Sequence, residues 1–245
     1  MRTEFRPASF PILPTVIKNL LIINALVFLA QIIFDGLDPM GSTLNVNIGF
    51  MSDTFALHTY QSPLFKPWQL LTHLFMHGDL AHIFFNMYAL WMFGSILENV
   101  WGPARFLTFY LVCGLGAAIC HMTALYFETQ HLADLISGAN PLAVVAQIEK
   151  YNIQMSEPTL GASGAVFGCL AAFGYLFPNT SLQIIFIPIP FKAKWFVLFY
   201  AGAELFMAVK NTAGDNVAHV AHLGGALVGF LLVLFWNKTN KKTFY

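Results

Sequence analysis

Six apolar segments run along this chain, and each approaches the length that a helix needs to cross a lipid bilayer. They are residues 16–34, 80–97, 106–127, 160–177, 195–209 and 217–236. About 20 apolar residues in a helix cover the roughly 30 Å of bilayer hydrocarbon. Only 10% of the residues are charged, whereas about 25% are charged in an average soluble domain. The sequence therefore predicts an all-α membrane protein, built as a bundle of six transmembrane helices.

The apolar segments leave too little chain for a separate soluble domain. We expect a tail at residues 1–15, one membrane domain at residues 16–237 and a basic tail at residues 238–245. Two longer outer segments, at about 35–79 and about 128–158, join the spans. The first is rich in aromatic residues from Trp68 onward, which is typical of chain that lies in the membrane interface. The second is polar and acidic and is expected to lie in water.

The positive charges predict which side of the membrane each loop faces. With the N-terminus in the cytoplasm, nine of the twelve Lys and Arg residues fall on the cytoplasmic side, and Lys66, Lys150 and Lys210 fall outside. An excess of positive charge marks cytoplasmic loops. An even number of spans then places both termini in the cytoplasm. The formal net charge of zero gives no indication of nucleic-acid binding.

The N-terminal segment bears on the membrane in which the protein resides. Arg2 and Arg6 precede the first apolar segment, as in a signal peptide, but no small-residue cleavage site follows Phe34. We therefore interpret residues 16–34 as a retained span. The lack of a presequence in this sequence and the compact six-span organisation predict a prokaryotic plasma membrane.

Polar side chains inside apolar spans are costly and are candidates for function. In the predicted topology, spans two, four and six all enter from the outer face, and each carries polar residues within its first two turns. They are His82 and Asn86 in span two, Ser163 in span four, and His219 and His222 in span six. A helix rises about 1.5 Å per residue, so these residues share a depth several ångströms below the surface. The sequence thus predicts a polar site that opens to the outer face.

Ser163 is the candidate nucleophile of this site. It lies in the sequence Gly161-Ala162-Ser163-Gly164. Small neighbours let a substrate backbone approach and expose N–H groups near the helix start, where the helix dipole favours negative charge. The alternative is that these small residues form only a packing face between membrane helices.

His222 is the candidate base that would take the proton from Ser163. Gly225 and Gly229 lie three and seven residues later, hence on the same helix face, and Gly164 and Gly168 form a matching pair in span four. Such glycine pairs allow two helix backbones to approach closely. The spacing therefore predicts a hydrogen bond between His222 and Ser163. The alternative is a histidine bonded to a backbone carbonyl.

The remaining polar residues of the spans are assigned by their position. His219 lies one turn before His222, nearer to water, and is interpreted as an interface residue. No acidic residue is expected to complete a triad, because Asp215 falls in an outer loop and Glu204 is expected to bond neighbouring helix groups. His82 and Asn86 share a helix face, and both can donate hydrogen bonds to an oxyanion without a formal charge. Their alternative role is polar contact between helices, worth about 1 kcal/mol or less.

These motifs, in this order, resemble those of the rhomboid intramembrane proteases over roughly residues 67–236. The motifs are Gly161-Ala162-Ser163-Gly164, His222-x-x-Gly225-x-x-x-Gly229 and His82-x-x-x-Asn86. The resemblance implies a six-helix fold and an intramembrane serine endopeptidase that cleaves single-span membrane proteins without a cofactor or metal. It implies Ser163 as nucleophile, His222 as general base, and an oxyanion hole of His82, Asn86 and the Ser163 amide. It also implies that Phe167 packs against the histidine ring, for which ordinary core packing is the alternative.

One position departs from the family pattern, and three other functions remain open. Gln69 follows Trp68 where many rhomboid sequences carry arginine, which puts the usual anchoring of the first outer segment in doubt. The first alternative function is a catalytically inactive rhomboid-like protein that binds or escorts membrane helices. The others are a transporter with a histidine relay and a metal protein, for which the candidate ligands are His73, His77 and His82. No His-Glu-x-x-His motif is present to support the metal protein.

Overall fold

The computed structural model describes residues 11–36, 49–138, 148, 151–152, 157–184, 187–210 and 217–239. Four of the predicted regions are only partly described. Residues 1–10 of the N-terminal tail, 37–48 of the first outer segment, much of the second outer segment and 240–245 of the basic tail lie outside the described residues, as does Asp215.

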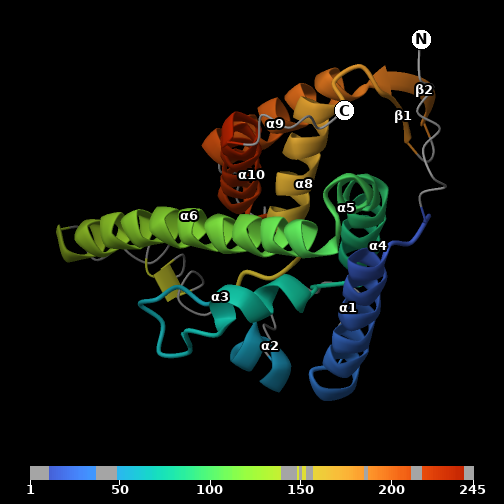
Figure 1. Cartoon of the computed structure of the whole chain (residues 1–245). Helices are drawn as coiled ribbons and strands as arrows, with labels where there is room; N and C mark the ends of the chain where they lie inside the picture. Colours follow the sequence, from blue (N-terminus) through green and yellow to red (C-terminus); the bar gives the residue numbers. More distant parts are fainter. Residues whose placement is uncertain are drawn as a thin grey trace, which may run out of the picture.

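Helices make up nearly all of the described chain (Figure 1). In order they are α1 (Thr15–Phe34), α2 (Phe50–Phe55), α3 (Gln69–Thr72), a 3-10 turn (His73–Phe75), α4 (Leu80–Ala89), a π-helical turn (Leu90–Gly94), α5 (Ser95–Trp101), α6 (Pro103–Gly138), α8 (Ser163–Leu176), α9 (Ala193–Lys210) and α10 (His219–Thr239). Two short antiparallel strands, β1 (Ser181–Ile184) and β2 (Ile187–Lys192), lie between α8 and α9. The chain is thus a helical bundle, as the apolar pattern predicts.

Four helical stretches in the described residues are long and apolar enough to cross a membrane. They are Thr15–Phe34, Leu80–Trp101, Pro103–Ile136 and His219–Lys238. They correspond to the first, second, third and sixth predicted spans. The fourth predicted span, residues 160–177, forms the apolar helix α8 of only 14 residues. The fifth, residues 195–209, forms α9, whose 18 residues include Lys194, Glu204 and Lys210.

Helix α6 extends beyond the predicted third span. The apolar segment ends at Phe127, whereas the helix continues to Gly138, into the segment that the sequence predicts as a polar outer loop. No proline interrupts residues 128–138, and Thr129 and Leu132 are buried in the protein. The length of the apolar run indicates which part of the helix has a composition suited to lipid. The helix itself continues for as long as its residues favour helix and find packing partners.

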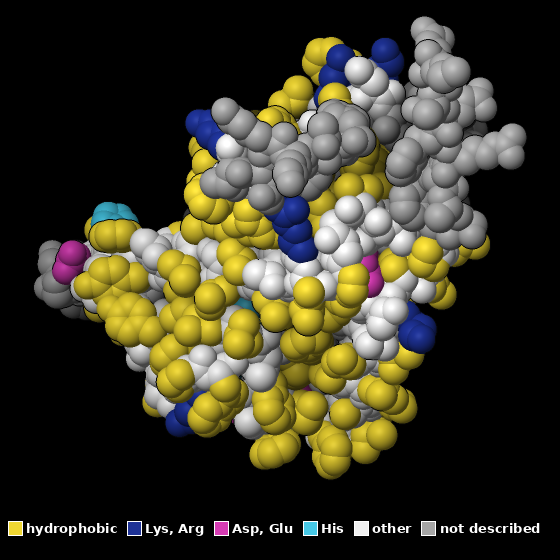
Figure 2. Space-filling model, viewed as in Figure 1, with side chains coloured by type: hydrophobic (Ala, Val, Ile, Leu, Met, Phe, Trp, Pro, Cys, Tyr) yellow, Lys and Arg dark blue, Asp and Glu magenta, His cyan; other side chains and the backbone are white. Residues whose placement is uncertain are grey.

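On the face shown in Figure 2, the described side chains are largely hydrophobic. Large apolar residues are more than half exposed on several helices, including Leu26 and Ile33 of α1 and Phe199 and Phe206 of α9. A soluble monomer rarely exposes apolar surface on this scale. The surface therefore suits contact with lipid tails.

Helix α8 lies against α10, α6 and α9, with α2 and α3 on the opposite side of α6 in the view of Figure 1. Glycines set the close approach of α8 and α10. A methyl group added at Gly225 would overlap the carbonyl oxygen of Gly164, and one at Gly229 would lie 2.7 Å from the Cα of Gly168. The two glycine faces therefore pack together as their spacing predicts.

Gln69 anchors the segment that precedes α4. Its side chain is fully buried, and its Oε1 accepts hydrogen bonds from the backbone N–H groups of His58 at 3.2 Å and Lys66 at 3.1 Å. Its Nε2 donates to the carbonyl oxygens of Asp53 and Leu64, both at 3.0 Å. An amide can both donate and accept. Gln69 thus ties three parts of this segment together by neutral hydrogen bonds.

Glu98 of α5 caps the start of α1. Its Oε1 accepts from the N–H of Val16 at 2.9 Å, and its Oε2 accepts from the N–H of Ile17 at 2.8 Å. The first N–H groups of a helix have no partner within the helix, and the helix dipole favours a negative charge there. The carboxylate, only 3% exposed, therefore joins the first helix to the rest of the bundle.

Replacement of Glu98 by glutamine is expected to destabilise the protein by about 1–3 kcal/mol, because hydrogen bonds to a charged group are worth about that much. Glutamine keeps the size of the side chain but presents an NH₂ group to one of the two N–H donors. Thermal unfolding in detergent measures the change. Glu157→Gln, which makes the same change at an exposed position before α8, is the control. Equal loss of stability in both variants would contradict the capping role.

Candidate active site

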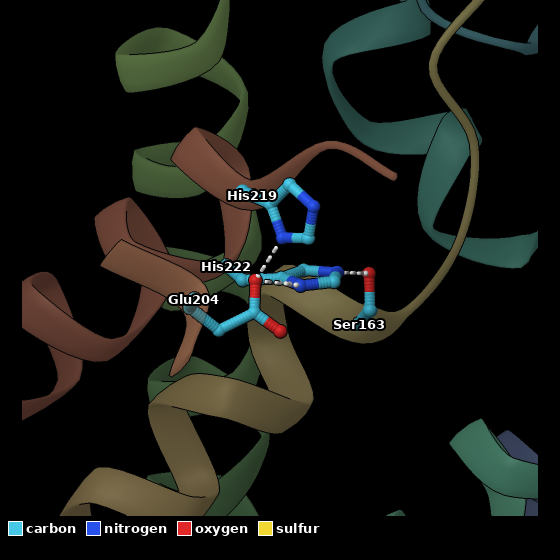
Figure 3. A network of polar contacts seen from close by, with 4 residues as sticks. All are labelled: Ser163, Glu204, His219 and His222. Carbon is cyan, nitrogen blue, oxygen red and sulfur yellow. Dashed lines mark hydrogen bonds and ion pairs between the residues drawn. The ribbon is translucent and has the colours of Figure 1, made fainter. Parts of the chain in front are cut away.

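Ser163 and His222 meet between α8 and α10 (Figure 3). Ser163 is the first residue of α8, and His222 lies in the first turn of α10. The Oγ of Ser163 is 2.8 Å from the Nε2 of His222, which is a hydrogen-bond distance. The two residues are far apart in the sequence, and the glycine contact of α8 and α10 brings them together. The His222 side chain is only 12% exposed.

Phe167 holds the plane of the His222 ring. The two rings stack with centroids 4.3 Å apart and planes only 8° from parallel. Phe167 follows Ser163 by one helical turn, so the same helix supplies the serine and the surface on which the histidine rests. Tyr200 of α9 lies on Phe167, with ring centroids 5.3 Å apart. The imidazole is therefore fixed in orientation by packing as well as by its hydrogen bond.

Gly161 creates the space beside Ser163. It has a φ of +125°, in the region that favours glycine, and its N–H donates to the carbonyl of His73 at 2.9 Å. A methyl group at Gly161 would lie 2.8 Å from the Nε2 of His82 and 3.6 Å from the Oγ of Ser163. Only glycine leaves this gap open between the two side chains.

The hydrogen bonds of His82 define which ring nitrogen carries a proton. The N–H of Gly78 donates to its Nδ1 at 3.3 Å, so the neutral ring carries its proton on Nε2, the nitrogen beside Gly161. Asn86 lies one turn further along α4 and is buried, and its Nδ2 donates to the His82 carbonyl at 3.0 Å. This bond uses one of the two amide hydrogens and leaves the other. Both side chains therefore retain an N–H donor.

His73 and His77 contribute no positive charge near the site. Burial lowers the pKa of His73 to about 4, and burial together with the neighbouring His82 lowers the pKa of His77 to about 3. The His77 and His82 rings meet edge to face, with centroids 5.2 Å apart. Both histidines are thus neutral at pH 7.

The structure bears out the expectation that Glu204 bonds groups of a neighbouring helix, but it also brings this carboxylate to His222, where the sequence predicts no acidic residue. The Oε2 of Glu204 lies 2.6 Å from the Nδ1 of His219 and 3.0 Å from the Nδ1 of His222 (Figure 3). The sequence places Glu204 in an apolar helix but does not show which way that helix faces. The cost of a carboxylate in such a helix is the signal that identifies it as a site residue.

The same three residues form the one cluster of potential metal ligands within the described part of the chain. The ligand atoms of Glu204, His219 and His222 lie within 4.8 Å of one another. Two ligands of a tetrahedral zinc ion lie about 3.3 Å apart, given zinc–ligand bonds of about 2.0 Å. The shorter 2.6 and 3.0 Å distances are those of direct hydrogen-bond and ion-pair contacts. The described residues do not bring His73, His77 and His82 together as a ligand cluster.

Fold and site together define a class of protein: a helical membrane protein with a serine and a histidine paired inside the bundle. Residues 64–238 match the Rhomboid domain. The chain therefore belongs to the rhomboid family.

Three relatives indicate what this chain is similar to. Rhomboid protein 1, mitochondrial, of Saccharomyces cerevisiae is 30% identical over 69% of this chain and 41% of its own length. RHOMBOID-like protein 12, mitochondrial, of Arabidopsis thaliana is 28% identical over 94% of this chain and 60% of its own length. Rhomboid protease GluP of Bacillus subtilis is 27% identical over 66% of this chain and 25% of its own length. The chain thus spans less than two thirds of each of these relatives.

The names of the yeast and Arabidopsis relatives correct one expectation from the sequence. Both proteins are described as mitochondrial. The prediction of a prokaryotic plasma membrane is therefore wrong, since these relatives point to a mitochondrial membrane instead. That prediction rested on the start of the sequence and on the number of spans, and neither feature is specific to one membrane.

Proposed function

We propose that this protein is an intramembrane serine endopeptidase that hydrolyses a peptide bond in or near the transmembrane segment of single-span membrane proteins. The observation that carries the proposal is the 2.8 Å contact between the Ser163 Oγ and the His222 Nε2. A serine hydroxyl is a weak nucleophile until a base accepts its proton. Membership of the rhomboid family and a relative named as a protease support the same reaction.

The reaction proceeds through an acyl-enzyme. The Ser163 Oγ attacks the peptide carbonyl while the His222 Nε2 accepts the hydroxyl proton. The scissile C–N bond then breaks as His222 gives that proton to the leaving amine. A water molecule attacks the ester, again losing its proton to His222, and Ser163 recovers a proton as the ester bond breaks. The stacked Phe167 holds the imidazole in place for each transfer.

Three donors stabilise the oxyanion of the tetrahedral intermediate. They are the Nε2–H of His82, the remaining amide hydrogen of Asn86 and the backbone N–H of Ser163. Ser163 is the first residue of α8, so its N–H also lies at the positive end of the helix dipole. The space at Gly161, between His82 and Ser163, gives room for the developing oxygen. Fixed donors of this kind act at low dielectric without having to reorganise.

The membrane arrangement that accompanies this function has six spans, with α8 and α9 as the fourth and fifth. The excess of positive charge places both termini on the cytoplasmic or corresponding inner side, and the site opens to the outer face. The relatives described as mitochondrial favour a mitochondrial membrane. The protease domain occupies residues 16–237 in this arrangement.

Covalent labelling tests the function directly. Protein purified in detergent is expected to react with a fluorophosphonate probe and to cleave a single-span model substrate, and Ser163→Ala is expected to lose both activities. The probe requires an activated serine and reports on chemistry without the need for the natural substrate. Ser95 is a buried serine outside the site, and the control variant Ser95→Ala is expected to keep the label.

Two outcomes would contradict the proposal. Labelling that persists in Ser163→Ala would place the reactive residue elsewhere. Folded protein that neither reacts with the probe nor cleaves any single-span substrate would favour the inactive rhomboid-like protein that binds or escorts membrane helices.

A further inference from the structure

Helix α9 contributes little buried surface to the bundle, apart from one acidic side chain. Its buried residues are Ala193 and Glu204, whereas Phe199, Phe206 and Val209 are each more than 60% exposed. A carboxylate among apolar side chains is costly unless a partner compensates its charge. The burial of Glu204 therefore requires specific contacts.

Those contacts are with the two histidines of α10 (Figure 3). The Nδ1 of His219 makes a hydrogen bond of 2.6 Å to the Oε2 of Glu204. The same oxygen lies 3.0 Å from the Nδ1 of His222, at ion-pair distance but without the alignment of a hydrogen bond. The opposite nitrogen of His222 faces Ser163. Glu204, His222 and Ser163 thus form a line across three helices, α9, α10 and α8.

We propose that Glu204 is a positioning residue for His222, a role that rests on the proposed protease function. As a general base, His222 must offer the lone pair of its Nε2 to the Ser163 hydroxyl. A neutral imidazole has one proton, so that proton must be on Nδ1. A carboxylate beside Nδ1 favours this tautomer.

The same carboxylate compensates the charge that forms during the reaction. When His222 accepts the Ser163 proton, it becomes an imidazolium, although its side chain is only 12% exposed to solvent. A negative charge 3.0 Å away stabilises this cation at low dielectric. Protons move only between Ser163, His222, the leaving amine and the hydrolytic water, and Glu204 stays ionised throughout. Glu204 therefore acts through His222 and touches no reacting atom.

His219 holds the carboxylate in place. Its hydrogen bond to Oε2 fixes the oxygen that faces His222, since both contacts involve this one atom. His219 lies one turn before His222 on α10, so the two rings approach the carboxylate from the same helix. The sequence analysis interprets His219 as an interface residue and does not predict this contact, through which His219 orients Glu204.

The alternative is that Glu204 only ties α9 to α10. A structural tie and a positioning role predict different kinetics. Loss of a tie lowers thermal stability and affects substrate binding, whereas loss of positioning lowers kcat with little change in KM. Glu204→Gln retains the size of the side chain and removes its charge, and Glu204→Asp retains the charge on a shorter side chain. The two variants separate charge from shape.

The experiment compares these variants with wild-type protein in detergent, with Gly202→Ala as the control on the same helix. Glu204→Gln is expected to lower kcat by a factor on the order of 10²–10⁴. The upper value is the loss of kcat that follows when the aspartate of a serine protease triad is replaced by asparagine. KM should change less than about threefold, and the fluorophosphonate labelling rate should fall with kcat. Glu204→Asp should recover part of both rates. Gly202, which has open space around it, should tolerate alanine with no change in either rate.

The outcomes distinguish this proposal from the function on which it rests. If wild-type protein cleaves and labels but Glu204→Gln keeps the wild-type kcat, the positioning role is wrong and the protease function stands. A fall in kcat that Glu204→Asp does not relieve at all, accompanied by a lower melting temperature in both variants, also overturns it in favour of a structural tie. If wild-type protein itself shows no Ser163-dependent labelling, the protease function fails first.

Discussion

Replacement of Gly225 by alanine is expected to abolish cleavage and to destabilise the protein. A methyl group at this position would overlap the carbonyl oxygen of Gly164, a backbone atom that no side-chain rotation can move away. The two helices must therefore separate, and the 2.8 Å contact between His222 and Ser163 lies one turn from the point of separation. Insertion of extra carbon into a tight core costs about 1–3 kcal/mol, even where neighbours can relax.

Gly202→Ala provides the matched control for this prediction. It makes the same chemical change in a neighbouring helix, where an added methyl group would meet nothing within 4 Å. Alanine is the better helix former by about 1 kcal/mol, so this variant should be at least as stable as wild type. Cleavage rate and thermal unfolding in detergent measure both variants. Wild-type cleavage by Gly225→Ala would show that contact of the glycine faces is not needed for the site.

The second large effect is expected at His222. Its replacement by alanine removes the proposed base and should reduce cleavage by a factor on the order of 10⁴–10⁶, as is found for the histidine of a serine protease triad. His219→Ala removes the hydrogen bond to Glu204 and leaves the proposed base in place. Its expected effect is about tenfold, the kinetic equivalent of one hydrogen bond of about 1.5 kcal/mol. Steady-state cleavage and the rate of fluorophosphonate labelling distinguish the two histidines.

These two variants also test the register of α10. Gly225 and Gly229 are in phase with His222, which faces Ser163, whereas His219 faces Glu204. If His219→Ala were inactive and His222→Ala active, the roles assigned to the two histidines would have to be reversed. That result would also refute the assignment of His222 as base.

The sequence predicts the helices that contact lipid and the pairing of Ser163 with His222 for clear physical reasons. Lipid imposes a length and an apolar composition on each span, and both can be read directly from the chain. Glycine spacing marks the faces on which two backbones touch. Since Gly164 follows Ser163 directly, and Gly225 follows His222 by three residues, contact of the glycines determines which histidine reaches the serine.

Other features depend on information that a single helix does not carry. The contact of Glu204 depends on how α9 is rotated against α10, and an amphipathic pattern cannot show this when nearly every face of the helix is apolar. The end of α6 depends on packing that the apolar run does not show, because Thr129 and Leu132 are buried after that run ends. Short strands β1 and β2 form around an Ile-Pro sequence that excludes a helix but does not itself specify pairing.

The 14-residue length of α8 has a consequence for the electrical insulation of the membrane. A helix of this length spans about 21 Å, less than the hydrocarbon thickness, so in the proposed six-span arrangement Ser163 begins below one surface. Between Ser163 and the other end of α8, the side chains of Leu170 and Phe173 are buried. The Phe173 ring packs against Phe93 and Phe177. In the proposed arrangement, water that reaches the serine meets these buried apolar side chains beyond it. The proposed hydrolysis can therefore take place within the bilayer while the ion gradient across it is preserved.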